Sequence, residues 1–384
     1  MDLIKQKCEQ VNNEYLESRK ESFYNRFVLG AKLGEGQHAS VYKCFKRVVP
    51  TETAETTPLT IDKCEKNECF PEAFAVKIMR SDDPEKIAAH KKEFEILRAL
   101  RHENIVEVKE LIEDSFKSQV FQVMSFVEGK EVLDEIADFR GYSEADARSL
   151  VRQLIEGVAY LHQKGVCHRD IKPSNILISP DSQRITLVDF NVAKQTSDAH
   201  FQMFTKGAGT LSFAAPERLS DEGAYDERVD VWAIGIVAYM LLVGQHPFEC
   251  QGSTALLLSQ IMNGESIVKE LLEDKEDLSS DAKNFICQFV RIKAIDRIGL
   301  KDSLSHPWFS SPLKQDSNLK LAVQNMSARR SSKRSQQFEF MERSPIGATK
   351  SKAVDFSDLV RRVSSLNEAH IFSLIKSKKI NSAG

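Results

Sequence analysis

Two short runs of polar residues hold the side chains with the clearest chemistry in this sequence. The first is HRDIKPSN, at residues 168–175, and the second is VDFNVAK, which contains Asp189. Asp170 can accept the proton of a substrate hydroxyl, and Lys172 can neutralise charge on a phosphate during transfer. Asn175 and Asp189 offer the hard oxygen ligands that Mg2+ prefers. This ordered set predicts phosphoryl transfer from a magnesium-bound nucleotide to a hydroxyl group.

A turn near the start of the chain, within LGEGQHASV, carries two glycines. Gly34 and Gly36 would let backbone amides approach a phosphate closely, where a larger side chain would obstruct it. Ala39 stands where a third glycine is usual in such loops, and its small side chain should cost little reach. Because Gly-x-Gly occurs in many turns, this motif indicates nucleotide binding only together with the other residues.

A lysine lies inside the apolar strand pattern AFAVKIM. One reading is that the Lys77 ammonium simply extends to the surface along its aliphatic stem. Glu93, sixteen residues further on in a helical pattern, gives it a possible partner. Glu95 is the rival carboxylate, but the register of the following Ile96-Leu97 pair favours Glu93. An ion pair would aim Lys77 at the α- and β-phosphates of a nucleotide.

The hydrophobic patterns predict two unequal lobes to hold these residues. Strand-like segments fill the first third: FVLGAKLGEG, ASVYKCFKRVV, AFAVKIM, IVEVKELIED and VFQVMSFV. A helical segment at residues 84–100 interrupts them. After Gly129 the period becomes helical, as in DARSLVRQLIEGVAYLHQKG. The order predicts an α+β fold with a small β-rich N-lobe and a larger helical C-lobe.

Further motifs complete a resemblance to a known family. They are Ala215-Pro216-Glu217, Asp230-Val231-Trp232, Arg297 and His306-Pro307-Trp308-Phe309. With the polar runs, they make residues 27–309 resemble the eukaryotic protein kinase family, most closely its calcium/calmodulin-dependent group. The resemblance implies a bilobal kinase fold, with an N-lobe at 27–128 and a C-lobe at 129–309. It also implies ATP and Mg2+ as cofactors.

The resemblance assigns roles to individual residues. Glu217 is expected to pair with Arg297, and Asp230 to brace the catalytic loop. Lys172 and Thr210 match the serine/threonine subtype rather than the tyrosine subtype. The implied catalytic set is Asp170, Lys172, Lys77, Glu93 and Thr210, and the implied metal ligands are Asn175 and Asp189.

The resemblance also implies an adenine-binding site. Val41, Ala75 and Leu177 would sandwich the base, and Met124 would be the gatekeeper. Backbone groups at residues 125–127 would hydrogen-bond to the base. The full implied nucleotide-binding set is Leu33, Gly34, Gly36, Val41, Ala75, Lys77, Met124, Ser125, Val127, Glu131 and Leu177.

Several positions depart from the family pattern. Leu211 and Ala294 replace prolines and Ser125 replaces an acidic residue, which bears on substrate preference rather than on phosphoryl transfer. Asn191 replaces the glycine that follows Asp-Phe and that allows the segment to flip. Asparagine tolerates left-handed backbone geometry better than most residues. We therefore expect Asp189 still to bind magnesium, and the segment to flip less readily.

Two other functions are compatible with a kinase fold. A pseudokinase acts as a binding scaffold and typically lacks at least one catalytic residue, whereas the full set is present here. A small-molecule kinase is disfavoured because Ala215-Pro216-Glu217 and Thr210 match the shelf for a protein substrate. We therefore expect an ATP-dependent kinase that acts on serine and threonine hydroxyls of proteins.

The composition is that of a globular protein, with 384 residues of which 41% are hydrophobic and 28% charged. The longest uncharged apolar stretch, residues 231–243, is too short to span a bilayer, so no membrane segment is expected. No nucleic-acid partner is expected. Seven scattered cysteines indicate reduced thiols. Cys64 and Cys69 lack a second ligand pair for zinc. We expect a cytoplasmic location, with the nucleus as the alternative.

Three segments lie outside this core pattern. Residues 1–26 are expected to form a polar leader, and residues 50–71, rich in Thr and Glu, a surface insertion. Residues 310–384 are expected to be a basic, Ser-rich tail, either regulatory or disordered. From Ser310 onward the sequence has 14 Lys and Arg but only 6 Asp and Glu. The tail therefore carries +8 and the rest of the chain -11, which favours binding of the tail to the body.

The tail also contains sequences that look like kinase substrates. Arg329-Arg330-Ser331-Ser332 and Arg361-Arg362-Val363-Ser364 place arginines shortly before a serine. Glu131 matches the position that receives such an arginine in basophilic kinases, so substrates with basic upstream residues are expected. A tail that binds in cis and inhibits the enzyme is one interpretation. The other is a disordered tail that is only phosphorylated in passing.

Two partners are expected from the regulatory pattern. Apolar residues at helical spacings among basic ones could form a calmodulin target: Phe356, Leu359, Val363 and Leu366. An upstream kinase could phosphorylate Thr205, with Arg169 and Lys194 as a basic pocket that orders the loop. A loop ordered without phosphate is the alternative.

Overall fold

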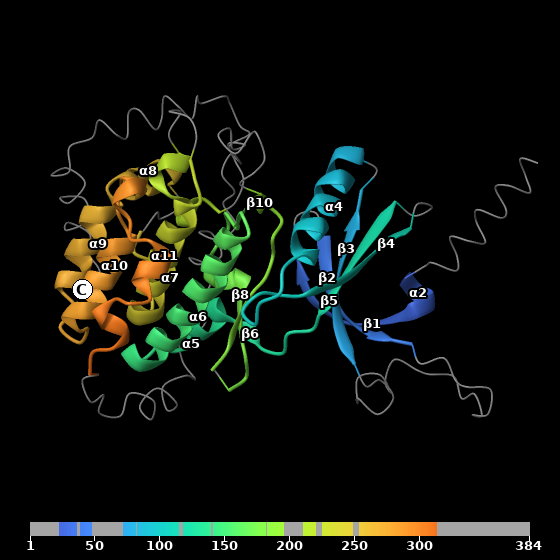
Figure 1. Cartoon of the computed structure of the whole chain (residues 1–384), viewed down its shortest axis with the longest axis horizontal. Helices are drawn as coiled ribbons and strands as arrows, with labels where there is room; N and C mark the ends of the chain where they lie inside the picture. The colour runs from blue at the N-terminus through green and yellow to red at the C-terminus, as the bar shows by residue number, and fades with distance from the viewer. Residues whose placement is uncertain are drawn as a thin grey trace, which may run out of the picture. The chain divides into compact units, whose positions relative to one another are not determined.

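The computed structural model describes residues 23–36, 39–47, 72–81, 83–114, 118–139, 141–181, 183–195, 210–219, 225–248 and 253–312. The expected insertion, most of the leader and nearly all of the tail lie outside these residues. The chain divides into two compact units. The N-terminal unit comprises Met1–Arg101 and Val106–Val127, and the C-terminal unit His102–Ile105 and Glu128–Gly384. The α+β division predicted from the sequence is confirmed (Figure 1).

The N-terminal unit is built on a five-stranded antiparallel sheet with the strand order β1-β2-β3-β5-β4. Its strands are β1 (Phe27–Glu35), β2 (Ala39–Lys46), β3 (Ala73–Arg80), β4 (Val108–Asp114) and β5 (Gln119–Ser125). Helix α4 (Pro84–Arg98) lies against the sheet (Figure 1). Asp83 caps α4 by accepting a hydrogen bond from the Glu85 amide, and Pro84 fits the first helical turn.

The register of the sheet separates two sets of side chains. Directly paired residues share a face, and the face alternates along each strand. Val41 pairs with Lys77, and Ala75 pairs with Met124, so these four side chains lie on one face. The opposite face carries a hydrophobic core that includes Phe74, Val76, Ile78, Phe121 and Val123. The sheet therefore presents the predicted nucleotide-binding residues on one side and its core on the other.

A short helix, α2 (Phe23–Arg26), completes that core. The Phe23 ring is fully buried and stacks between Phe27 and Phe121, at centroid distances of 5.1 and 4.6 Å. Arg26 forms an ion pair with Glu110 on β4. Because of these contacts, Phe23–Arg26 belong to the packed N-terminal unit, although the sequence patterns placed them in a leader.

The C-terminal unit is mainly helical. Its longer helices are α5 (Val132–Phe139), α6 (Glu144–Gln163), α7 (Arg228–Val243), α8 (Thr254–Met262), α9 (Gly264–Glu273) and α10 (Ser280–Phe289), with the short α11 (Leu300–Ser303). Its strands are β6 (Lys130–Glu131), β7 (Val166–Cys167), β8 (Ile176–Ile178), β9 (Ile185–Leu187) and β10 (Lys194–Gln195). The described residues of this unit also form five 3-10 turns: η1 (Pro173–Asn175), η2 (Leu211–Phe213), η3 (Pro216–Arg218), η4 (Ala294–Asp296) and η5 (Pro307–Phe309).

Helix α7 forms the centre of this unit. Its residues from Val229 to Leu242 are all buried, as expected for a helix that is apolar on every side. Gly244 ends it in the left-handed conformation, with φ of 75°. No helix in the described parts of the chain is both long and apolar enough to cross a membrane.

Gly129 fixes the start of β6 against β8. Its φ is 152°, and a Cβ atom at this position would lie 2.0 Å from the Ile178 carbonyl oxygen. Only glycine can therefore hold the two backbones this close. The pairing that follows places Glu131 opposite Leu177.

The packing of α2 leads to a stability prediction. Phe23→Ala should lower the free energy of unfolding by about 3–5 kcal/mol, because it leaves a cavity between two aromatic rings. The free energy of unfolding is measured by urea denaturation, followed by far-UV circular dichroism. Leu33→Ala, at a side chain that is 47% exposed, is the control and should change stability by about 0.5 kcal/mol or less. Equal stability of the two variants would contradict a structural role for α2.

Candidate active site

Asp170 is held by three neighbours in the C-terminal unit. Its Oδ1 accepts a hydrogen bond from the Thr210 amide at 2.8 Å, and its Oδ2 accepts one from Asn175 Nδ2 at 3.0 Å. Lys172 Nζ lies 3.3 Å from Oδ2 and donates to Thr210 Oγ1 at 2.8 Å. Four of the seven residues predicted to act in catalysis and metal binding therefore form one connected cluster.

The charge state of Asp170 follows from this cluster. Burial alone would raise the pKa of the carboxyl group, but the charge of Lys172 and the hydrogen bonds from Thr210 outweigh it and lower the pKa below its usual value. Asp170 is thus an anion at neutral pH. A carboxylate with a low pKa is a weak base, so it is better suited to orient a hydroxyl than to remove its proton early.

The neighbouring oxygen atoms fit a hard cation. Asn175 uses Nδ2 for both of its bonds to Asp170, so its amide oxygen is the atom that can serve as a ligand. The Val188 amide donates to the Asn175 carbonyl at 2.9 Å, which ties the segment carrying Asp189 to residues 168–175, the predicted catalytic run. An amide oxygen and a carboxylate are the donor types that Mg2+ takes up. The chemistry of the predicted metal ligands therefore matches the ion.

Asp189 is held in an unusual backbone conformation. Among the described non-glycine residues, only Ser118, Arg169 and Asp189 have positive φ, and that of Asp189 is 59°. The next residue, Phe190, is buried and packs edge-on against His168 at 4.5 Å. Asn191 is exposed and has no positive φ, so this conformation does not require glycine there. The left-handed tolerance of asparagine, on which the sequence argument relied, is not used in this state.

Asp230, at the start of α7, braces the catalytic run as the resemblance implied. Its Oδ1 accepts from the Arg169 amide at 2.8 Å, and its Oδ2 accepts from the His168 amide at 2.9 Å. His162 Nε2 and Cys167 Sγ also lie within hydrogen-bonding distance of Oδ2. Burial opposes ionisation, but His162 and the backbone donors lower the pKa of Asp230 to about 2. His162 could not be identified from the sequence, because no local spacing relates it to Asp230.

The expected pair of Glu217 and Arg297 is also present. The two Arg297 Nη atoms bind the two Glu217 carboxylate oxygens at 2.6 and 2.7 Å, the bidentate geometry that arginine favours. Arg297 also donates to the Arg228 carbonyl and lies over the Trp232 ring. This pair fixes η3 against the base of α7.

A second arginine cluster, which the sequence analysis missed, surrounds Arg169. Arg218 Nη1 donates to the Arg169 carbonyl at 2.8 Å. Tyr225 forms side-chain hydrogen bonds with both arginines. Burial raises the pKa of Tyr225, although both guanidinium groups act against that rise. Arg169, beside Asp170, is therefore held by Arg218 and Tyr225.

In the N-terminal unit, Lys77 pairs with Glu93 rather than with Glu95. Lys77 Nζ lies 2.8 and 3.2 Å from the two Glu93 oxygens, and both side chains are more than nine-tenths buried. His90, one turn earlier on α4, places Nδ1 3.3 Å from Glu93 Oε2. Burial would raise the pKa of Glu93, but Lys77 and His90 lower it to about 2. Glu95 is exposed and faces Arg98.

The glycine-bearing turn leaves open space beside this face of the sheet. A Cβ atom at Gly34 would meet none of the described atoms within 4 Å, and one at Gly36 would meet only the Ala39 carbonyl at ordinary contact distance. No internal crowding in the described structure therefore requires glycine at either position. Leu33 exposes 47% of its surface beside them. Space that a Cβ would fill, next to an exposed apolar side chain, fits a nucleotide that approaches the backbone closely.

The remaining predicted residues occupy the following places. Ser125 pairs with Phe74 at the end of β5, and Val127 ends the N-terminal unit. Glu131 and Leu177 pair with each other across β6 and β8 in the C-terminal unit. The predictions for Thr205, the cysteine pair at 64 and 69 and the tail motifs fall outside the described residues.

Comparison with known proteins agrees with this geometry. The protein kinase domain family matches residues 61–309. The chain therefore belongs to the protein kinase family. The match starts after β1 and β2, yet β2 pairs with β3 and β1 pairs with β2, so the glycine-bearing turn is part of the same sheet.

The relatives place the chain near one group within the family. It is 37% identical over 233 residues to calcium/calmodulin-dependent protein kinase type 1 from Macrobrachium nipponense, which covers 60% of this chain and 65% of that protein. It is 38% identical over 220 residues to the Caenorhabditis elegans protein of the same name, covering 57% and 61%. Myosin light chain kinase A from Dictyostelium discoideum is 35% identical over 224 residues, covering 58% and 73%. The chain thus spans less than two thirds of the two type 1 kinases, and the resemblance to their group is confirmed.

The low pKa of Asp230 predicts acid sensitivity. A carboxyl group whose folded pKa of about 2 lies below its unfolded value stabilises the fold fully above that unfolded value, near 3.9. The contribution is lost as the pH falls from about 5 towards 2, and a shift of this size is worth about 2–3 kcal/mol. Asp230→Asn should be less stable than the unaltered protein at pH 7. Between pH 7 and pH 3, its free energy of unfolding should fall less steeply than that of the unaltered protein.

The control for this titration is Asp277→Asn at an exposed position. It should reproduce both the stability and the pH dependence of the unaltered protein. A pH dependence that is identical in all three proteins would show that Asp230 does not titrate as the contacts imply.

Proposed function

We propose that this chain is a magnesium-dependent serine/threonine protein kinase that transfers the γ-phosphoryl group of ATP to protein hydroxyls. The observation that carries the proposal is the cluster in which Thr210, Asn175 and Lys172 all contact Asp170. The contact of Lys172 with Thr210 supports the serine/threonine subtype. The Lys77–Glu93 pair supplies the remaining charged element that the family uses.

In this proposal each residue acts through its charge or its geometry. Asp170 accepts a hydrogen bond from the incoming hydroxyl and orients its oxygen for attack. Lys172 lies beside that carboxylate and offsets negative charge that develops on the transferred group. Lys77, held by Glu93, binds phosphate oxygens of the nucleotide. Mg2+, when held by Asn175 and Asp189, would neutralise phosphate charge.

The rival reading is a pseudokinase that binds partners without useful catalysis. In a pseudokinase, the predicted catalytic residues need not contact one another, because no reaction depends on their arrangement. Instead, the buried Lys77–Glu93 pair and the hydrogen bonds around Asp170 are formed within the chain. This completeness favours the enzyme over the scaffold.

Replacing Asp170 discriminates between the two readings. Asp170→Asn should reduce phosphoryl transfer by about 100-fold to 10,000-fold, the usual range for loss of such a group. Nucleotide affinity should change little, because Asp170 is not among the residues assigned to nucleotide binding. The measurements are transfer from labelled ATP to a peptide library and nucleotide binding by calorimetry. Asp181→Asn, at an exposed position, is the control, and equal turnover of the two variants would leave only the scaffold.

Activation by an upstream kinase that phosphorylates Thr205 is a finer proposal. Its support is Arg169, which lies beside the catalytic aspartate and can bind a phosphate. In this structure Arg169 already hydrogen-bonds to Tyr225. That contact favours the alternative, in which the loop at residues 191–214 is ordered without phosphate.

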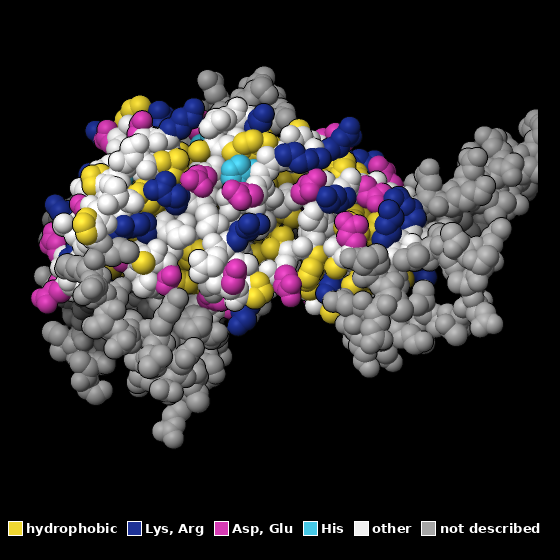
Figure 2. All heavy atoms as spheres, turned by 60° about the horizontal axis from the view of Figure 1, so that its bottom comes forward, with side chains coloured by type: hydrophobic (Ala, Val, Ile, Leu, Met, Phe, Trp, Pro, Cys, Tyr) yellow, Lys and Arg dark blue, Asp and Glu magenta, His cyan; other side chains and the backbone are white. Residues whose placement is uncertain are grey.

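Regulation by the tail is the second finer proposal. The tail carries net positive charge while the rest of the chain carries net negative charge. Figure 2 shows Asp and Glu side chains interspersed with Lys and Arg on the face that it displays, so attraction there would depend on local pairs rather than on one large acidic area. Several relatives are named as calcium/calmodulin-dependent kinases. We infer that the tail binds the body in cis and that calmodulin can compete for it.

Truncation tests the tail directly. A chain that ends after Pro312 keeps all described residues, and under autoinhibition its activity on an added peptide should rise several-fold. Any stimulation by calcium and calmodulin should be lost at the same time. The isolated segment 313–384 should bind calmodulin in the presence of calcium. Unchanged activity together with no binding would leave a tail without a regulatory role.

A further inference from the structure

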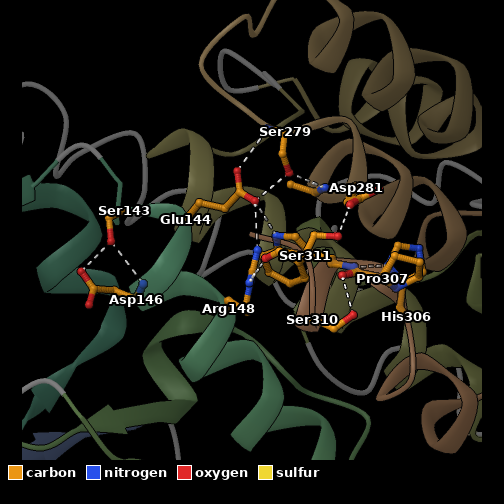
Figure 3. A network of polar contacts seen from close by, with 12 residues as sticks. Ser143, Glu144, Asp146, Arg148, Ser279, Asp281, His306, Pro307, Ser310 and Ser311 are labelled. Atoms are coloured by element: carbon orange, nitrogen blue, oxygen red, sulfur yellow. Dashed lines mark hydrogen bonds and ion pairs between the residues drawn. The ribbon is translucent and has the colours of Figure 1, made fainter. Parts of the chain in front are cut away.

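The end of the described chain is fastened to two helices of the C-terminal unit. Ser311 Oγ donates a hydrogen bond to Asp281 on α10, and its backbone carbonyl accepts one from Arg148 Nη1 on α6 at 2.9 Å. The amides of Ser310 and Ser311 donate to the Pro307 carbonyl at 2.9 and 2.8 Å. We call these contacts of residues 310–311 the C-terminal anchor (Figure 3).

Glu144 organises the groups around the anchor. Its Oε1 accepts from Ser279 Oγ at 2.6 Å and from Trp308 Nε1 at 3.0 Å, and its Oε2 accepts from the Ser279 amide at 3.0 Å. Arg148 Nη2 lies 3.5 Å from Oε1. Figure 3 shows Glu144, Arg148 and Ser279 converging on one place beside Ser311. Arg148 therefore contacts both the Glu144 carboxylate and the Ser311 carbonyl.

Ser311 is half-buried, and its two neighbours are more accessible. Ser310 and Pro312, on either side of Ser311, are exposed. Proline at 312 has no amide hydrogen and favours extended backbone at the residue before it, the conformation in which kinases bind peptides. From this juxtaposition, we propose that Ser311 is a phosphorylation site for a proline-directed serine/threonine kinase, and that the phosphate releases the C-terminal anchor.

The reaction is a simple phosphoryl transfer from ATP. A new bond forms between Ser311 Oγ and the γ-phosphorus, and the bond from that phosphorus to the bridging oxygen of ATP breaks. ADP leaves, and the hydroxyl proton passes to the catalytic base of the modifying kinase. The site does not require this chain's own catalytic activity.

The phosphate reverses the hydrogen-bonding character of Ser311. The hydroxyl donor to Asp281 is lost, and a group carrying about -1.5 to -2 charges replaces it. Asp281 and Glu144 would both repel that group, and Arg148, which binds the Ser311 carbonyl, is shared with Glu144. The start of α10 offers little compensation, because Ser279 already caps the Ala282 amide. Repulsion should therefore exceed attraction, and residues 310–312 should detach.

The first experiment tests the modification. Full-length protein carrying Asp170→Asn, which removes self-phosphorylation, is incubated with a purified cyclin-dependent kinase, ATP and Mg2+. Mass spectrometry should locate phosphate at Ser311, and Pro312→Ala should reduce it about tenfold or more. The other residues with a hydroxyl that precede a proline, Thr57, Ser179 and Ser344, are quantified separately. Phosphate at those positions without phosphate at Ser311, or equal phosphate at Ser311 with and without Pro312, overturns the proposal.

The second experiment tests the release. Hydrogen exchange of the Ser310 and Ser311 amides should become about tenfold faster after phosphorylation, because each amide loses its bond to Pro307. In Asp281→Asn the same modification should accelerate exchange far less, since the amide can donate to the phosphate. Unchanged or slower exchange in the otherwise unaltered protein would show that the phosphate is retained in the anchor, and would overturn the release.

Discussion

One buried carboxylate, that of Asp230, sets the geometry of the catalytic run. A charge with no exposure to water is tolerated only where donors surround it, and here two backbone amides, a histidine and a thiol do so. These amides belong to the residues immediately before Asp170. The carboxylate therefore determines the path of the backbone, and the path determines where Asp170 points. Helix α7 can hold this charge in place because its own apolar residues are buried on every side.

Two further largely buried carboxylates, one in each unit, are also ionised only because neighbouring groups stabilise their charge. Glu93 is ionised because Lys77 and His90 outweigh its burial, and Asp170 because Lys172 and Thr210 do. Each is an acceptor whose position is fixed before any ligand arrives. Electrostatic stabilisation of this kind costs no reorganisation when charge develops in a reaction. The arrangement suits a transfer in which orientation and charge matter more than strong basicity.

The sequence predicted the parts of this structure that local pattern controls. The five strands, the helix over residues 84–98 and the choice of Glu93 over Glu95 all follow from periodicity and spacing. Helix α2 could not be predicted, because four residues carry no period and its stability comes from aromatic rings elsewhere in the chain. His162 and Tyr225 were missed for a related reason. Their partners, Asp230 and Arg169, lie more than fifty residues away in the sequence. No local spacing pattern predicts contacts of that kind.

The contact at Gly129 limits how this chain can vary. With a Cβ atom 2.0 Å from the Ile178 oxygen, no side chain is accommodated unless β6 separates from β8. Separation of the strands would shift Glu131 away from Leu177. A substitution of Gly129 would therefore displace two residues that the new side chain does not contact. Position 129 should therefore appear in a saturation mutagenesis screen as intolerant of all nineteen alternatives, alanine included. A residue with no functional group would thus behave genetically like a member of the site.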